Sequence, residues 1–538
     1  MALMRTAFSA LTAERSELEE RMPLVASISF EELSKARTVV SCQPVRCSGC
    51  GAVLTNPRHV KEDERLGVHW TCEYCSTVNI ISKDEIPPGG GDDIDFVLDE
   101  PPDTKESPGS LPESKSVDTV AVIDTSGSMS FNKLDAVKQS LNETLADLRV
   151  NAPTSAFALI TFDSTVAVHT LPGEAPVVLS GDVLRNSDQL IAQLVEMIDP
   201  RTLQPVGEMG ERWTELVTSL PARGMTALGP AVNSALWLLK TRGGGRLVLL
   251  TDGMANVGLG TLTGPSSSGR DFYKRAARSA MDAGIVVDVV GMRDKSESNE
   301  MALDVIGELA SSSGGGIYYV SAAEVEGSFR QIRGQEFLGH DVSLRLVTPR
   351  TLEVERITGP GAKADAAKTR LGAVTADREV FIRLKRSGKL EKKKVPLQAQ
   401  IEYRDAQGRR HLRVSSINVD TIKDAKAYAK GYDTDIPTVM AMQEAGEEYF
   451  RNRTASSLDR LRAMKNNLAT VASSAPIGKA QDTATKNLAF VEREIDRLSK
   501  AESEIRPKAA KASKRAVKGL SMQRMSVSQR HAEDDDCG

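Results

Sequence analysis

The stretch Thr119-Val-Ala-Val-Ile123 is followed directly by Asp124-Thr125-Ser126-Gly127-Ser128. The apolar run predicts a buried strand, and three oxygen-bearing side chains at alternate positions begin where that strand ends. Carboxylate and hydroxyl oxygens are the ligands that a hard divalent cation prefers. The segment therefore indicates a metal site, with a strand end capped by Ser and Asp in an ordinary turn as the alternative.

Two segments farther along the chain can complete the same site. Thr226 precedes a helical pattern, and Leu247-Val-Leu-Leu-Thr-Asp252-Gly253 is a second apolar run that ends on a carboxylate. The carboxyl ends of parallel strands meet at one edge of an open α/β sheet, so these side chains can converge although they are far apart in sequence. We expect Mg²⁺ or Mn²⁺ to be held by five residues: Asp124, Ser126, Ser128, Thr226 and Asp252.

Strand and helix patterns alternate around these segments. Strand candidates lie at Thr119–Ile123, Ala156–Phe162, Arg246–Thr251, Ile285–Gly291 and Ile317–Val320. Helical patterns between them lie at Lys133–Arg149, Ala227–Leu239, Phe272–Ala283 and Met301–Ser311. This alternation predicts an α/β fold with a doubly wound, Rossmann-like sheet over residues 116–335.

The five oxygen ligands, in this order, resemble the metal-ion-dependent adhesion site (MIDAS) of von Willebrand factor A domains. The resemblance covers the whole predicted domain. In that family three hydroxyls and two carboxylates, some acting through water, hold Mg²⁺ and leave one position open for an Asp or Glu of a partner. The resemblance thus implies a protein partner that presents an acidic side chain.

Four of the six cysteines form two CxxC pairs, Cys47-Ser-Gly-Cys50 and Cys72-Glu-Tyr-Cys75. Their separation is close to that of a four-cysteine zinc ribbon, and four thiolates make a closed, structural Zn²⁺ site. Redox CxxC motifs are the alternative, and four ligands are too few for a two-zinc RING. Metal ligation in a reducing compartment makes the cytoplasm the expected location. Cys42 and Cys537 receive no role.

This segment resembles the zinc finger of the COPII inner-coat subunits. The shared features are Asn56-Pro57 after the first cysteine pair, Trp70 before the second and Asn79 after it. The order of ribbon, A-type domain, sandwich and helices resembles the same family. This chain is shorter and has no evident gelsolin-like module, and those subunits generally use their A-like trunk as an interface without the metal.

The other patterns divide the rest of the chain. We expect an N-terminal amphipathic helix and a possible sandwich strand over 1–40, with Thr38–Ser41 as that strand, the zinc ribbon over 41–85, and a linker rich in Pro, Gly and acidic residues over 86–115. Period-two alternation predicts an antiparallel β-sandwich over 336–420. Helices follow over 421–505, and a disordered tail over 506–538 has weak anion or membrane-surface binding as its alternative reading.

Composition excludes several classes of function. The 538 residues carry a net charge of -4 and 4% aromatic residues, which disfavours RNA binding. The sequence has no apolar run of the roughly 18 residues that a membrane-spanning helix needs. A similar ribbon beside an A-type domain also resembles circularly permuted Ras-like proteins. The chain has no GxxxxGK[ST] motif, however, and Asn132-Lys-Leu-Asp135 lies on a predicted helix, so we expect no GTPase.

These observations favour a non-enzymatic, metal-dependent adaptor that captures an acidic residue of a partner. Ser and Thr hydroxyls donate little charge, so a bound cation keeps a field that an incoming carboxylate can neutralise. No nucleophile with a neighbouring base is apparent in the sequence. The alternative is a COPII-coat-like structural protein of intracellular vesicle transport, peripheral to endomembranes, in which the A-type domain is an interface and its metal is incidental.

Overall fold

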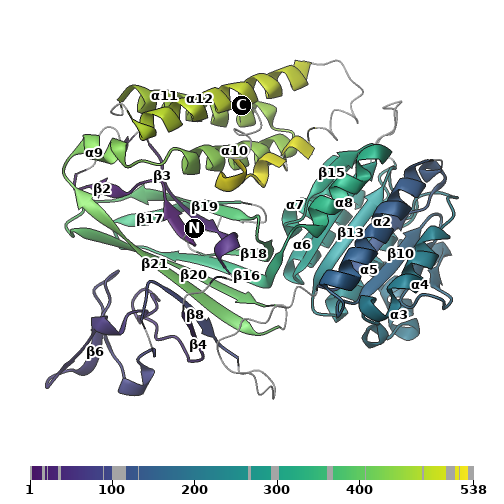
Figure 1. Cartoon of the computed structure of the whole chain (residues 1–538), viewed down its shortest axis with the longest axis horizontal. Helices are drawn as coiled ribbons and strands as arrows, with labels where there is room; N and C mark the ends of the chain where they lie inside the picture. Colours follow the sequence, from purple (N-terminus) through teal and green to yellow (C-terminus); the bar gives the residue numbers. More distant parts are fainter. Residues whose placement is uncertain are drawn as a thin grey trace.

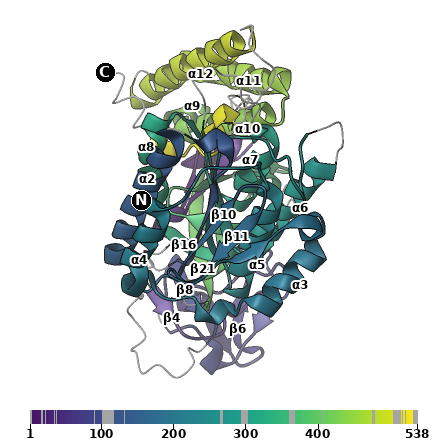
Figure 2. The same ribbon diagram turned by 90° about the vertical axis from the view of Figure 1, so that its right-hand side faces the viewer.

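The computed structural model describes residues 3–14, 19–20, 22–33, 35, 38–88, 90–99, 117–130, 132–263, 268–292, 302–359, 368–405, 408–474, 478–503, 515, 517–519 and 521–530. Within these residues the strands form four sheets. In Figure 1 an α/β unit lies at the right, beside a β-sandwich that has helices above it and a small ribbon below it. Figure 2, turned by 90°, again shows α11 and α12 at the end opposite to the ribbon strand β6.

The α/β unit is built on a seven-stranded sheet of order β12-β11-β10-β9-β13-β14-β15. Its strands are β9 (Thr119–Asp124), β10 (Phe157–Phe162), β11 (Val166–His169), β12 (Val177–Leu179), β13 (Gly245–Thr251), β14 (Ile285–Met292) and β15 (Ile317–Val320). Five strands are parallel, and β11 and β12 continue the sheet antiparallel at one edge. We call the unit from β9 to α8 the A-type domain.

Helices cover both faces of this sheet because successive strand residues point to opposite sides. Ala121 and Ile123 pack with α2 (Asn132–Asn151), α4 (Val206–Thr218) and α8 (Val325–Arg333). Val120 and Val122 pack with α3 (Ser187–Met197), α5 (Leu228–Thr241), α6 (Ser268–Asp282) and α7 (Leu303–Ser313). The predicted doubly wound α/β fold is confirmed.

Two sheets make the β-sandwich, with orders β1-β3-β19-β17 and β18-β16-β20-β21-β8-β4, and β2 pairs with β21. The strands are β1 (Met4–Thr6), β2 (Ala10–Thr12), β3 (Leu24–Ser29), β4 (Thr38–Val40), β8 (Asp93–Val97), β16 (Phe337–Val347), β17 (Leu352–Thr358), β18 (Lys368–Thr375), β19 (Glu379–Arg386), β20 (Lys394–Arg404) and β21 (Arg410–Ile422). One large apolar core lies between the sheets and the helices above them. The predicted antiparallel alternation is present in β16–β21.

The expected N-terminal helix is wrong for the described residues Met4–Thr6, Ala10–Thr12 and Leu24–Ser29, which form strands. β3 pairs with β1 and β19, which makes this segment part of the sandwich. Glu19 and Glu20 are helical, and the buried Glu19 carboxylate lies 2.7 Å from Arg386. The acidic residues near the N-terminus therefore include an internal ion-pair partner.

Two other expectations change. The expected linker contains β8, which pairs with β21; its residues 100–116 lie outside the described part of the chain. The expected disordered tail is wrong for 517–519 and 521–530. Met522, Met525 and Val527 are buried there, and Arg524 pairs with Asp377 at 2.8 Å. The apolar side chains between the basic ones make this segment amphipathic. Residues 504–514 and 531–538 lie outside the described part.

The ribbon consists of β5 (Val60–Asp63), β6 (Gly67–Thr71) and β7 (Val78–Ile80). The C-terminal helices are α9 (Ala425–Lys430), α10 (Asp435–Phe450), α11 (Thr454–Ser474) and α12 (Lys479–Ser503). Pro437 lies in the first turn of α10, where proline is tolerated. In the described parts of the chain, every helix is too short or too polar to cross a bilayer.

Candidate cation site and cysteine cluster

The ends of β9 and β13 place two carboxylates at one edge of the A-type sheet. The strands are parallel neighbours, with Ile123 opposite Leu250, so Asp124 and Asp252 both follow the last paired residues. The loop before α5 reaches the same edge, because the Gly127 amide donates a hydrogen bond to the carbonyl of Gly224 at 3.1 Å. Three segments distant in sequence thus meet there.

A chain of hydrogen bonds joins four of the five predicted ligands. Asp124 Oδ1 accepts from the Ser126 amide at 2.9 Å. The hydroxyls of Ser126 and Ser128 lie 3.1 Å apart, and Ser128 Oγ donates to Asp252 Oδ1 at 2.6 Å. Asp124 and Asp252 have no exposed surface. Both carboxylates therefore lie in a buried polar site and do not face solvent.

Thr226 lies beside this chain of hydrogen bonds. A Cβ built on Gly253 would lie 3.7 Å from Thr226 Oγ1 and 3.9 Å from Ser128 Oγ, so both hydroxyls approach the same position. Asn256 holds the Thr226 backbone in place with two hydrogen bonds. Its side-chain Oδ1 accepts from the Thr226 backbone amide at 2.9 Å, and its backbone amide donates to the Thr226 carbonyl at 3.1 Å. The structure brings all five predicted residues together.

Sequence reasoning missed two residues that contact the carboxylates. Thr251 Oγ1 donates to Asp124 Oδ2 at 2.6 Å. Lys133, at the start of α2, donates from Nζ to Asp252 Oδ2 at 2.6 Å and to the Ser128 carbonyl at 3.3 Å. The position of Thr251 directly before Asp252 could have indicated that its hydroxyl lies near the site. Lys133 offered none, since a lysine in the first turn of a surface helix usually points to solvent.

The donor set suits a hard divalent cation, since it combines two carboxylates with three hydroxyls. Burial raises the pKa of Asp124 to about 6, although hydrogen bonds from Ser126 and Thr251 oppose this shift. The carboxylate therefore needs a nearby positive charge to stay ionised at lower pH. Lys133 supplies one positive charge at Asp252, and a metal ion would supply two.

The four cysteines of the ribbon form a compact cluster. Their Sγ atoms all lie within 4.8 Å of one another, with Cys47 to Cys75 and Cys50 to Cys72 each at 3.5 Å. These distances are too long for a disulfide. Four sulfurs around a tetrahedral zinc, each about 2.3 Å from it, would be roughly 3.8 Å apart. The cluster therefore fits a closed metal site with tetrahedral coordination.

Residues around the cysteines hold the two knuckles together. Asn79 Oδ1 accepts from the amide and the hydroxyl of Ser48 at 2.9 and 3.0 Å, and its Nδ2 donates to Cys47 Sγ at 3.5 Å. Trp70 is buried in the small core of the ribbon. The Gly49 amide also donates to Cys47 Sγ at 3.4 Å. Such N–H···S bonds stabilise a metal-bound thiolate.

This chain is similar to several known proteins. The family model described as the Sec23/Sec24 trunk domain matches residues 120–331. The human COPII-coat protein Sec24c matches with a TM-score of 0.70 and 14% identity, over 98% of this chain and 74% of that chain. A von Willebrand factor type A structure from Catenulispora acidiphila matches at a TM-score of 0.46 and 17% identity, over 75% and 89% of the two chains.

A curated relative is "Circularly permutated Ras protein 1" from Dictyostelium discoideum. It is 23% identical over 469 residues, which are 80% of this chain and 55% of that protein. The chain thus spans about half the length of this relative. Together the comparisons show a Sec24-like fold along nearly the whole chain, with a trunk-type domain at residues 120–331.

Proposed function

We propose that this protein is a non-enzymatic scaffold of the COPII-coat type, which acts in intracellular vesicle transport in the cytoplasm at the surface of endomembranes. The observation that carries the proposal is the extent of the fold similarity to Sec24c, 98% of the chain. It includes the ribbon, the A-type domain, the sandwich and the helices.

The joining of ribbon and sandwich supports a scaffold. Gln398 of β20 accepts from the Val53 amide at 2.8 Å and donates to the Val53 carbonyl at 2.9 Å. Arg345 of β16 donates to the Cys50 carbonyl at 2.8 Å. Paired bonds of this kind fix both the position and the orientation of the ribbon. Surfaces on the two parts therefore keep a constant geometry for partners.

The histidine with the most carboxylate contacts among the described residues also supports a non-catalytic role. His411 is buried and lies 3.1 Å from Asp95 and 3.2 Å from Asp405. The neighbouring Tyr403 hydroxyl donates to the same Asp95 at 2.9 Å. Both ring nitrogens of His411 are thus occupied by carboxylates, so neither is free to accept a proton from a hydroxyl nucleophile.

A second candidate function is favoured by the cation site. Asp124, Ser126, Ser128, Thr226 and Asp252 would hold Mg²⁺ or Mn²⁺, and the metal would bind an Asp or Glu of a partner protein. In this reading the scaffold recruits one partner through the A-type domain. For the ribbon, we propose that Cys47, Cys50, Cys72 and Cys75 hold a structural Zn²⁺.

Affinity capture with mass spectrometry tests both candidates in one design. The full chain, its Asp124→Ala variant and an Asp182→Ala control serve as baits, each in buffer with Mg²⁺ and in buffer without added divalent cation. Asp182 is also in the A-type domain, but its side chain is 96% exposed. A coat-type scaffold captures vesicle-transport proteins equally with all three baits and in both buffers.

The outcomes separate the two candidates. Loss of one partner in the absence of Mg²⁺ and with Asp124→Ala, but not with Asp182→Ala, supports metal-dependent capture. If no vesicle-transport component is retained under any condition, the coat-type proposal is wrong.

A further inference from the structure

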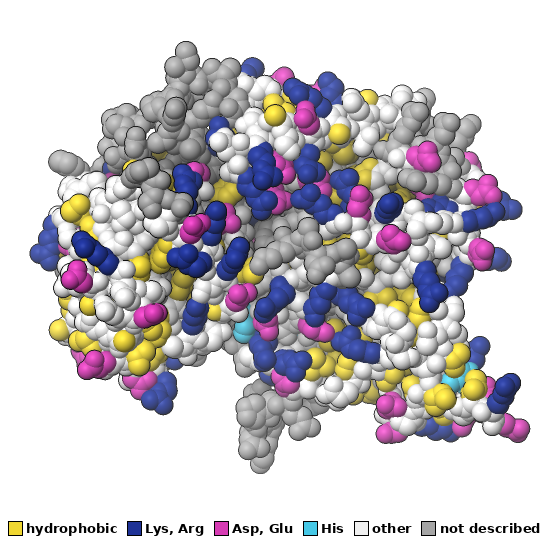
Figure 3. All heavy atoms as spheres, turned by 180° about the vertical axis from the view of Figure 1, so that it is seen from behind, with side chains coloured by type: hydrophobic (Ala, Val, Ile, Leu, Met, Phe, Trp, Pro, Cys, Tyr) yellow, Lys and Arg dark blue, Asp and Glu magenta, His cyan; other side chains and the backbone are white. Residues whose placement is uncertain are grey.

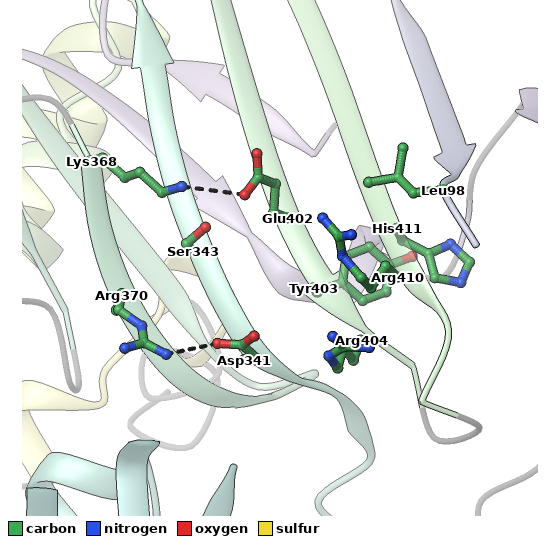
Figure 4. Close-up of a pocket in the computed structure, with 10 residues that line it drawn as sticks. All are labelled: Leu98, Asp341, Ser343, Lys368, Arg370, Glu402, Tyr403, Arg404, Arg410 and His411. Carbon is green, nitrogen blue, oxygen red and sulfur yellow. Dashed lines mark hydrogen bonds and ion pairs between the residues drawn. The ribbon is translucent and has the colours of Figure 1, made fainter. Parts of the chain in front are cut away.

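A small cavity lies on the surface of the sandwich sheet, and none of the five cation-site residues or the four clustered cysteines lines it. Its volume is about 220 Å³, and it is lined by strands β18, β16, β20 and β21 (Figure 4). The lining includes four cationic side chains and two carboxylates: Lys368, Arg370, Arg404, Arg410, Asp341 and Glu402. On the face shown in Figure 3, Lys and Arg side chains gather toward the middle of the molecule with Asp and Glu among them.

Two of these cations face each other directly. Arg404 of β20 and Arg410 of β21 are opposite residues in the antiparallel register. Like charges at directly opposite positions destabilise a sheet. Both guanidinium groups lie 3.9 Å from the same carboxylate, Asp99. One carboxylate at the limit of ion-pair distance therefore serves two arginines.

The opposite wall of the cavity carries two more cations with closer partners. Lys368 lies 3.2 Å from Glu402, and Arg370 lies 2.9 Å from Asp341 (Figure 4). Glu402 is also shared with Arg46 of the ribbon at 3.2 Å, and Arg370 has a second carboxylate, Asp282, at 3.9 Å. Positive charge thus stays in excess around the cavity.

The cavity has a fixed shape. Tyr403 and His411 are stacked with ring centroids 4.8 Å apart, and both are tied to Asp95. Asp341 has a φ of 51° at an irregular point in the pairing of β16. Such irregularities re-aim a side chain, and here the carboxylate reaches Arg370. A ligand would therefore enter a preformed site.

We propose that this cavity binds a phosphate monoester between Arg404 and Arg410 on one wall and Lys368 and Arg370 on the other. Guanidinium groups match phosphate oxygens in pairs. A phosphate monoester offers three terminal oxygens and up to two negative charges, so it can contact both walls. A carboxylate has two oxygens and one charge. The phosphate could be carried by a soluble molecule or by a lipid, and this proposal does not rest on the proposed function.

Calorimetry of the full chain with glycerol phosphate tests the site. The Arg404→Gln/Arg410→Gln double variant keeps polar side chains and removes two charges, and we expect its affinity to fall about tenfold or more. The control is Arg451→Gln/Arg462→Gln, since these arginines are similarly exposed. Arg451 directly follows α10, and Arg462 lies on α11. Vesicles of phosphatidylcholine with and without phosphatidic acid form the second arm. Binding only in solution supports a soluble phosphate ester, and binding to phosphatidic acid as well supports a lipid.

A stability measurement tests the like-charge pair separately. Without phosphate and at low salt, the double variant should unfold at the same temperature as the wild type or higher, because the repulsion is gone. The proposal is overturned if the wild type does not bind glycerol phosphate, if the double variant binds it as tightly as the control, or if an Asp/Glu-rich peptide binds more tightly.

Discussion

The Lys133 ammonium lies 2.6 Å from Asp252 Oδ2, inside the group of oxygens that we assign to a divalent cation. The side chain of Lys133 is almost fully buried, and that of Asp252 is fully buried. A lysine in this position balances one of the two carboxylates when no metal is bound. It also repels a cation that enters. The residue therefore sets both the stability of the metal-free domain and its affinity for the metal.

The first prediction concerns Lys133→Met. We expect the variant to bind Mg²⁺ or Mn²⁺ about tenfold more tightly in calorimetry, because a competing charge a few ångströms away is removed. Without metal it should be less stable, by about 3 kcal/mol, because Asp252 is left buried without that partner. Added Mg²⁺ should restore the unfolding temperature. Lys138→Met, on the same helix, is the control, and equal metal affinity in wild type and Lys133→Met would refute the competition.

The second prediction concerns the cysteine cluster. Cys72→Ser, or removal of metal by a strong chelator, should unfold the ribbon, since structural zinc contributes roughly 10 kcal/mol or more to such small units. Hydrogen exchange of β5–β7 reports the loss. Cys42→Ser is the matched control, because Cys42 lies outside the four-sulfur cluster. A purified protein with no zinc by elemental analysis and a protected ribbon would contradict this assignment.

The third prediction concerns pH. Burial opposes the charged form of His411, but hydrogen bonds with Asp405 and Asp95 outweigh it and raise its pKa to about 9 from 6.5. Because the folded pKa is raised, the stabilisation is complete below pH 6.5 and is lost as pH rises through about 9. It amounts to about 3 kcal/mol. Denaturant unfolding of wild type and His411→Asn across this range should show a difference that shrinks as pH rises; a constant difference would refute it.

The fourth prediction concerns the C-terminal segment. Met522 is buried between this segment and α10, since a Cβ on Gly446 would lie 2.7 Å from Met522 Cβ. Met522→Ala should cost about 2–5 kcal/mol by leaving a cavity. Met197→Ala is the control, because Met197 is 54% exposed on α3, and it should cost almost nothing. Equal unfolding free energies for the two variants would show that the segment does not pack in solution.

The sequence predicts the A-type domain well because its strands are buried on both faces and end on polar residues. Asp124 and Asp252 were found because parallel strands bring their carboxyl ends together. Lys133 was not found, because helical periodicity does not show that its side chain reaches Asp252. The N-terminal strands were missed because β3 pairs with β19, more than 300 residues away, and local propensity carries no record of such pairing. The pairing of Arg404 with Arg410 was also missed, because it depends on the register between β20 and β21.

The position of β3 between β1 and β19 has a consequence for biosynthesis. Ser29 pairs with Glu379, so its partner leaves the ribosome 350 residues later. At about 5–20 residues per second, this delay is roughly 20–70 s. During that time the whole A-type domain is translated and can fold by itself, while the apolar N-terminal segment waits without its neighbour. The apolar side of β3 and its unpaired strand edge therefore stay exposed, and prone to aggregation, until β19 has been translated.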